Sequence, residues 1–180
     1  MKTRYRLLFT ILLLIFVGCA SMNDSLTPNA KMIKSDFDNS IEISQDNVSA
    51  ASSINEGWHV LGLFWTNRNK DSVILNVGRN GTTIIDGVAF NIDGEIISLK
   101  PIDVLTDYSF NPNMNWSYKR FQISMKNFLK LAKADTVKMK VEGVSTYTVS
   151  TFGKKHLGAV ISNKFPNFLS LLEKNGVGIQ

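Results

Sequence analysis

The segment Val88–Leu99 constrains the fold more strongly than any other part of the sequence. The dipeptide Asp93-Gly94 divides it into two apolar-rich halves, and Asp-Gly is typical of a two-residue β-hairpin turn. Such a turn pairs Phe90 with Ile97 and brings the two ends of the segment opposite each other, so the apolar side chains share one face. Because register and burial agree, the segment predicts an antiparallel hairpin with one buried face.

Short apolar stretches separated by turn residues continue this pattern through most of the chain. Residues 40–44 alternate between polar and apolar side chains, as expected for a strand with one buried face. Residues 58–65 are apolar at nearly every position, which indicates a central strand covered on both faces. The complete set of predicted strands comprises residues 40–44, 58–65, 72–79, 88–92, 95–99, 116–123, 137–142 and 145–152.

Two segments have helical spacing instead. Ser124 is a favourable N-cap for a helix that ends near Ala134. Pro166 suits the first turn of a second helix, which Asn175-Gly176 ends. We therefore predict an α+β, β-rich fold: a mostly antiparallel sheet or sandwich of about seven or eight strands, with two short helices packed over one side or edge.

The N-terminus has the three regions of a secretory signal peptide. Basic residues come first, an apolar run of 11 residues follows at positions 7–17, and small residues surround Cys19. A helix that spans the bilayer core needs about 20 apolar residues, so this run is too short to remain as a membrane span. The basic residues are Lys2, Arg4 and Arg6. The sequence therefore predicts an exported protein.

The stretch Phe16-Val17-Gly18-Cys19 resembles the lipobox of bacterial lipoproteins, and the resemblance covers only the first 19 or 20 residues. It implies that the chain is cut before Cys19 and that this cysteine carries diacylglycerol and an amide-linked fatty acid such as palmitate. Ala20 after the cysteine implies sorting to the outer membrane. The alternative is an ordinary signal peptide that is cut after Ala20.

This interpretation divides the chain into three parts. Residues 1–18 form the lipoprotein signal peptide, residues 19–36 a lipidated flexible tether, and residues 37–180 a single globular β-rich domain. The net charge of +5 includes three of the 20 basic residues in the signal, which leaves 17 basic against 15 acidic residues. We therefore expect no nucleic-acid partner, and with a single cysteine we expect no internal disulfide.

No catalytic, cofactor-binding or metal-binding motif stands out in the sequence. His59 and His156 are far apart and lack the closely spaced partners that metal sites show. No serine lies in a nucleophile-elbow pattern. Five carboxylates are clustered in the sequence and leave open a pair of the kind that glycosidases use. They are Asp86, Asp93, Glu95, Asp103 and Asp107.

Two groups of side chains are candidates for contact with other molecules. Lys126, Lys130 and Lys133 fall on one arc of the first helix, where they could touch anionic lipid or an acidic partner, or simply face water. Aromatic residues flank the Asn-rich loop 109–117, where they could stack on sugars or anchor a protein. Core packing is the alternative explanation for these aromatics.

The leading functional hypothesis is a lipid-anchored binding or assembly module of the cell envelope, attached to the outer membrane through Cys19 with its domain in the periplasm. Its partner would be an envelope protein or a glycan. One alternative is an envelope hydrolase that acts on glycan or peptide with carboxylates from residues 86–107. A second alternative is a structural protein that docks on the membrane or on neighbouring proteins.

Overall fold

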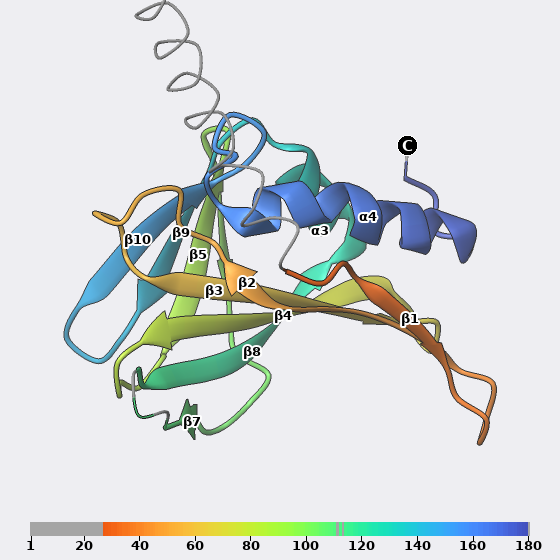
Figure 1. The fold of residues 1–180 in the computed structure, drawn as a ribbon, viewed down its shortest axis with the longest axis horizontal. Coiled ribbons are helices and arrows are strands. Elements are labelled where there is room, and N and C mark those ends of the chain that lie inside the picture. The colour runs from red at the N-terminus through yellow and green to blue at the C-terminus, as the bar shows by residue number, and fades with distance from the viewer. Residues whose placement is uncertain (1–26, 111, 113, 180) are drawn as a thin grey trace, which may run out of the picture.

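The computed structural model describes residues 27–110, 112 and 114–179. The described residues form an α+β, β-rich fold with two antiparallel sheets and two helices, which confirms the predicted fold class (Figure 1). One sheet has six strands in the order β1-β2-β3-β4-β8-β7, and the other has four in the order β10-β9-β5-β6. The predictions that concern Cys19 and the signal peptide lie outside the described residues.

The elements have the following bounds. The six-stranded sheet contains β1 (Lys31–Lys34), β2 (Ile41–Ser49), β3 (His59–Thr66), β4 (Asn69–Asn80), β7 (Asp107–Ser109) and β8 (Trp116–Ser124). The four-stranded sheet contains β5 (Gly87–Ile92), β6 (Glu95–Leu99), β9 (Val137–Glu142) and β10 (Tyr147–Phe152). The helices are α3 (Met125–Lys133) and α4 (Val160–Lys174).

The hairpin of β5 and β6 has the predicted register. Phe90 lies opposite Ile97, and the ends of the two strands pair as expected. Asp93 has φ of 48° and Gly94 has φ of 103°, the positive values that a type I′ turn requires at both central residues. The turn dipeptide therefore determines the register of this hairpin.

The first helix was predicted correctly and the start of the second was not. Ser124 caps α3, where its hydroxyl accepts a hydrogen bond from the Asn127 backbone N–H at 3.4 Å. The prediction that Pro166 lies in the first turn of the second helix is wrong, because α4 begins at Val160 and contains Pro166 in its interior. The two turns before the proline bury apolar side chains, which stabilise the helix there without a side-chain cap.

The strand β1 corrects the predicted tether. Residues 31–34 pair with β2, so the flexible tether predicted over residues 19–36 is wrong in this part. The buried Lys164 of α4 donates hydrogen bonds to the Thr27 carbonyl at 3.0 Å and to Asn29 Oδ1 at 3.1 Å. The chain is therefore held against the domain from Thr27 onward, and residues 19–26 lie outside the described residues.

The core lies on one side of the six-stranded sheet. Figure 1 shows α4 along that side, with β5, β9 and β10 standing beside it. Along β3, Leu61, Leu63 and Trp65 are buried, whereas Val60 and Phe64 on the opposite face are only half-buried. Among the described residues, no helix lies over this outer face (Figure 1).

Candidate functional site

Three of the five clustered carboxylates are engaged by partners within the protein. Asp93 accepts hydrogen bonds from two backbone N–H groups in the loop before β9. Glu95 pairs with Lys130 at 2.7 Å, and Asp103 pairs with Arg120 at 2.7 Å. Hydrogen bonds from Arg120 lower the pKa of Asp103, which is opposite to the raised pKa that a general acid needs. These three carboxylates therefore have separate structural partners.

The remaining two carboxylates lie on different sheets. Asp86 directly precedes β5, and Asp107 begins β7. Within the part of the chain that the structure describes, no group of three or more His, Cys, Asp or Glu side chains could hold a metal ion. The residues 86–107 thus give no support to the hydrolase hypothesis.

The three lysines of the predicted basic arc are exposed on one face of α3. Lys130 is bound to Glu95, and the Lys133 ammonium contacts the backbone carbonyl of Ile179. Lys126 lies one turn before Lys130 on the same face. Intramolecular contacts thus engage two of the three positive groups, and a role in binding anionic surfaces stays a prediction.

His59 joins the two sheets. Its ring is buried, with Nδ1 2.8 Å from Ser150 Oγ and Nε2 2.8 Å from Thr148 Oγ1, both on β10. Burial and the positive charge of Arg79 lower the pKa of His59 to about 4, so the ring is neutral at pH 7. Both ring nitrogens are engaged inside the protein, so His59 is a structural group.

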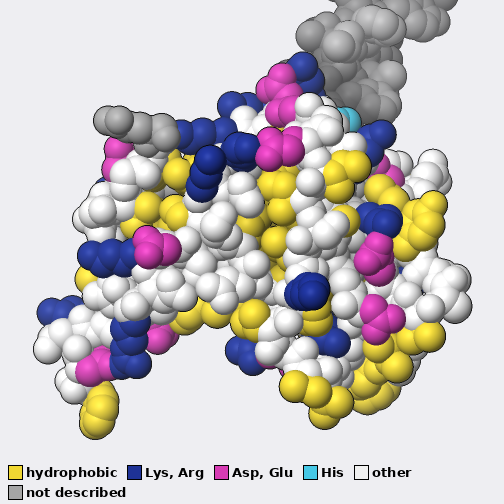
Figure 2. Space-filling model, turned by 180° about the vertical axis from the view of Figure 1, so that it is seen from behind, with side chains coloured by type: hydrophobic (Ala, Val, Ile, Leu, Met, Phe, Trp, Pro, Cys, Tyr) yellow, Lys and Arg dark blue, Asp and Glu magenta, His cyan; other side chains and the backbone are white. Residues whose placement is uncertain are grey.

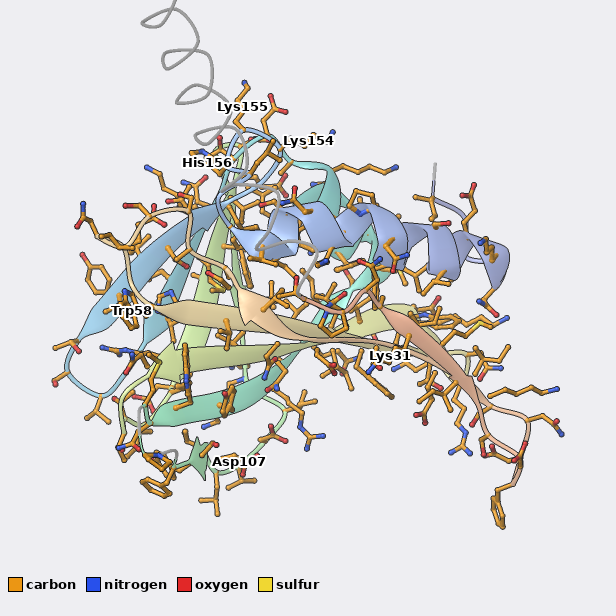
Figure 3. All side chains as sticks on the ribbon, viewed as in Figure 1. Lys31, Trp58, Asp107, Lys154, Lys155 and His156 are labelled. Carbon is orange, nitrogen blue, oxygen red and sulfur yellow. The ribbon has the colours of Figure 1, made fainter. Side chains whose placement is uncertain are left out.

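The second histidine lies in another loop and has a different partner. His156 lies in the loop before α4, beside Lys154 and Lys155 (Figure 3). Its Nε2 is 3.3 Å from Thr136 Oγ1. The structure thus gives the two histidines different side-chain partners.

Glu56 fixes the loop between β2 and β3 against β10. Its carboxylate accepts hydrogen bonds from the backbone N–H groups of Ser52 and Thr151, each at 3.0 Å. Burial raises the pKa of Glu56, but hydrogen bonds from Thr151 and Ser52 outweigh this effect and the net shift is downward. The backbone N–H of Gly57 also donates to the Val149 carbonyl at 2.8 Å. These bonds hold the loop as one wall of a surface pocket.

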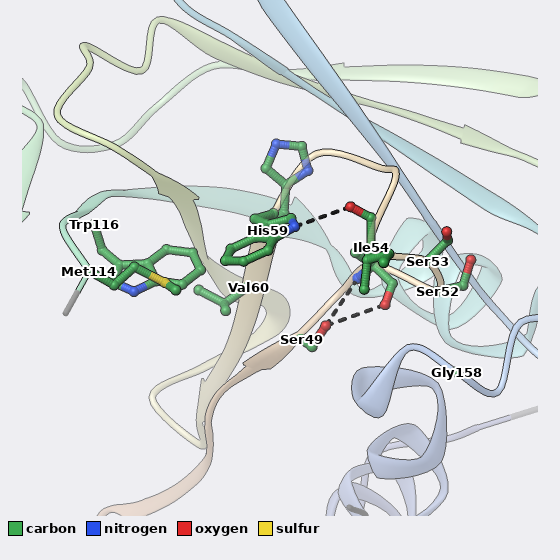
Figure 4. A pocket seen from close by; sticks show the side chains of 11 residues that line it. Ser49, Ser52, Ser53, Ile54, His59, Val60, Met114, Trp116 and Gly158 are labelled. Atoms are coloured by element: carbon green, nitrogen blue, oxygen red, sulfur yellow. Dashed lines mark hydrogen bonds between the residues drawn. The ribbon is translucent and has the colours of Figure 1, made fainter. Parts of the chain in front are cut away.

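This pocket, which we call the aromatic pocket, has a volume of about 370 Å³ and is formed by Ile54, Trp58, Val60, Met114 and Trp116 together with small residues. Figure 4 shows Met114 and Trp116 on one side, Ile54 on the other and Val60 between them. Trp58 and Trp116 lie on either side of the last residue of β4, two strand spacings or about 10 Å apart at the backbone. Strand pairing thus brings together two tryptophans that are distant in the sequence.

The serine hydroxyls of the aromatic pocket are already engaged within the protein. Ser49 Oγ bonds to the backbone of residue 51, and Ser52 Oγ lies 3.4 Å from the Glu56 carboxylate. Ser53 Oγ accepts a hydrogen bond from a backbone N–H at 3.2 Å. None of the described residues that line the pocket carries a charge at pH 7. The pocket therefore offers apolar contact rather than a reactive group.

Aromatic side chains continue from the pocket along β8, and a second aromatic pair lies at β7. Trp116 stacks on Tyr118 with ring centres 6.2 Å apart, and Tyr108 stacks on Phe110 at 6.4 Å. Phe110 is 72% exposed. Figure 2 shows hydrophobic side chains gathered along the lower edge on this side of the molecule. Tyr108 lies opposite the buried Ser117 and shares its face of the sheet, whereas Trp116 and Tyr118 project from the other face. A role for these aromatics in binding sugars or a protein stays a prediction.

Other aromatic candidates belong elsewhere, and the sequence did not indicate every pocket residue. Trp65 and Phe121 are buried in the core, so core packing accounts for them. Ile54 and Met114 were not singled out, because an isolated apolar residue in a loop carries no periodic signal. Their position depends on loop contacts that are made only in the folded chain.

Comparisons of the chain with protein-family models, curated proteins and solved structures found no match. In the part of the chain that the structure describes, no helix is long and apolar enough to cross a membrane. The functional argument therefore rests on the geometry of the site and on the sequence signal at Cys19.

Proposed function

We propose that this protein is a lipid-anchored binding or assembly module of the bacterial cell envelope, and that it holds a partner protein through the aromatic pocket. The observation that carries the proposal is the pair of tryptophans that flank an exposed, uncharged pocket. The lipobox resemblance at Cys19 supports attachment to the outer membrane, with the domain in the periplasm.

A protein partner suits the pocket because of its chemistry and its surroundings. Interfaces are enriched in Trp and Tyr, and their strongest contacts place an apolar anchor in a well-packed pocket. The volume of about 370 Å³ falls within the range of about 300–1,000 Å³ that ligand pockets occupy. Tyr118, which stacks on Trp116, extends the aromatic contact area beside the pocket. We therefore expect an apolar side chain of the partner to enter the pocket.

The proposal is tested by cross-linking in intact cells from a photoreactive residue placed at position 54. We expect one discrete adduct with the original chain and its loss in Trp116→Ala, because truncation of a central interface tryptophan costs about 2 kcal/mol or more, or about 30-fold in affinity. Tyr147→Ala is the matched control, since Tyr147 is an exposed aromatic on β10 outside the pocket. An adduct that persists in Trp116→Ala and disappears in Tyr147→Ala would contradict the assignment of the pocket.

The anchor is tested separately with Cys19→Ser. We expect this variant to lose incorporation of a labelled fatty acid and to move from the membrane fraction to the soluble fraction, because two or more acyl chains are needed for stable attachment. Ser21→Ala, two residues further on, should retain both label and location. A native chain that carries an unmodified Cys19 thiol would refute lipidation without affecting the pocket experiment.

A further inference from the structure

A second pocket lies on the outer face of the six-stranded sheet, next to the aromatic pocket. It has a volume of about 340 Å³, and the residues that line it include Asn47, Gly62, Phe64, Ile74 and Asn76. We call it the amide pocket, after its two asparagines. We propose that the amide pocket binds an uncharged, polyhydroxylated ligand, namely a sugar ring of a neutral glycan. This site is distinct from the proposed protein contact and does not depend on it.

The floor of the amide pocket is bare backbone at Gly62. A Cβ atom added at Gly62 would lie 2.3 Å from Asn47 Oδ1, so the Asn47 side chain leans over the glycine. Asn76 lies directly opposite Gly62 on β4. The absence of a side chain at position 62 thus lets two amide groups from different strands meet above the sheet.

The two amides present complementary groups to a ligand. Asn76 Nδ2 donates a hydrogen bond to Asn47 Oδ1 at 3.2 Å, which orients both side chains. This bond leaves the Asn47 amide with donor N–H groups and the Asn76 amide with an acceptor oxygen. Within the described structure neither group makes another side-chain bond. A sugar hydroxyl both donates and accepts, so neighbouring hydroxyls on one ring match this pair.

An apolar wall stands beside the amides. Phe64 and Ile74 face each other across β3 and β4, and both are half-buried. The face of an aromatic ring is electron-rich, and the C–H groups of a sugar ring carry partial positive charge, so the two surfaces attract each other. A pocket that combines an aromatic ring with paired amides therefore suits a sugar ring better than it suits an apolar side chain of a partner protein.

The charged groups around the amide pocket are paired with one another. Arg120 forms a two-point contact with Asp103, with distances of 2.7 Å from Nη2 and 3.0 Å from Nε. Asp46 lies 3.7 Å from the Lys31 ammonium. Because each charge has a partner of opposite sign, the site favours an uncharged ligand. The aromatic pocket differs, since its hydroxyl groups are engaged in its own loop.

The proposal is tested by titrating the ¹⁵N-labelled full chain with two neutral probes, chitotriose and maltotriose, and following the amide resonances. We expect saturable shifts at residues 44–47, 62–64 and 74–76 with at least one probe. Asn76→Ala should weaken binding about tenfold, the loss expected for a hydrogen bond whose partner is left unsatisfied. Gln122→Ala removes an amide from the same sheet face outside the pocket and should leave the affinity unchanged.

A second variant separates binding from folding. Phe64→Leu keeps an apolar side chain but removes the aromatic ring, and it should also weaken binding in a chain whose amide spectrum is otherwise unchanged. Absence of saturable shifts with both probes, or equal affinities for Asn76→Ala and Gln122→Ala, would overturn the proposal. Shifts centred on residues 58–60 and 114–116 would overturn it as well, because they place the sugar in the aromatic pocket. The sugar titration does not depend on the result of the cross-linking experiment with Trp116→Ala. Either proposal can therefore fail while the other holds.

Discussion

Replacing Phe128 by Ala lowers the free energy of unfolding by about 3–5 kcal/mol, the range for removing a fully buried phenylalanine. Phe128 is 0% exposed and projects from α3. Its ring meets those of Phe165 and Phe168 on α4 edge to face, with ring centres 6.2 Å and 5.6 Å apart. The substitution therefore leaves a cavity at the junction of the two helices. Urea unfolding at pH 7, followed by circular dichroism, measures the loss.

The matched control is Phe110→Ala, which removes the same side chain from an exposed position. Phe110 is 72% exposed, so we expect a change within about 0.5 kcal/mol. Similar losses for the two variants would show that α3 and α4 are not joined through this aromatic cluster. A change in the denaturant dependence alone, with no change in midpoint, would also contradict a simple cavity effect.

The features that sequence predicted well are those that local chemistry determines. The register of β5 and β6 follows from Asp93-Gly94, because the positive φ angles of the turn leave only one pairing of the flanking residues. The start of α3 follows from Ser124, whose hydroxyl replaces a missing backbone acceptor. In both places a few adjacent residues are enough to determine the local structure.

Edge strands and the start of α4 could not be predicted in this way. Every residue of β1 and of β7 is exposed, so neither strand shows the alternation that reveals a buried face. The first turns of α4 have no side-chain cap, and burial of Val160 and Ile161 stabilises them. These elements depend on neighbours that come from distant parts of the chain.

The same limit applies to the candidate sites. Sequence drew attention to the aromatics near loop 109–117, but nothing local indicates that Trp58 lies across β4 from Trp116. The carboxylates of residues 86–107 appeared to be a group because they are close in sequence, and the hairpin and loop turns direct them to different partners. Long-range strand pairing decides both outcomes, and a single sequence does not encode that pairing in any short segment.

The outer face of the six-stranded sheet carries both proposed sites on neighbouring outward positions of β3. Val60 lines the aromatic pocket, and Gly62 forms the floor of the amide pocket. Near Val60, the serine hydroxyls form hydrogen bonds within the loop that Glu56 fixes. The amides of Asn47 and Asn76 above Gly62 instead keep donor and acceptor groups without an intramolecular partner among the described residues. The two adjacent pockets therefore differ in the polar groups that they leave unpaired.

Lowering the pH from 6.5 to about 4 reduces the free energy of unfolding by about 3 kcal/mol through His59 alone. Burial, and then the charge of Arg79, lower its pKa from 6.5 to about 4 in the folded protein. Above pH 6.5 the imidazole is neutral in both states and its contribution to stability is fully present. Below that pH the unfolded chain binds a proton that the folded chain does not, so each unit costs about 1.4 kcal/mol until the folded ring also titrates.

Urea unfolding at four pH values between about 7 and 4.5 measures this slope. The carboxylates with lowered pKa, such as Asp103 and Glu56, lose their contribution only at lower pH, so the interval from about 6.5 to 5 isolates the histidine. His59→Gln should flatten the curve in that interval, whatever its stability at pH 7, because comparing slopes removes the cost of the substitution itself. The same measurement on His156→Gln shows whether any of the slope comes from the other histidine. A flat curve for the original chain would mean that the folded protein binds a proton at His59 over the same pH range as the unfolded chain, and would contradict the lowered pKa of His59.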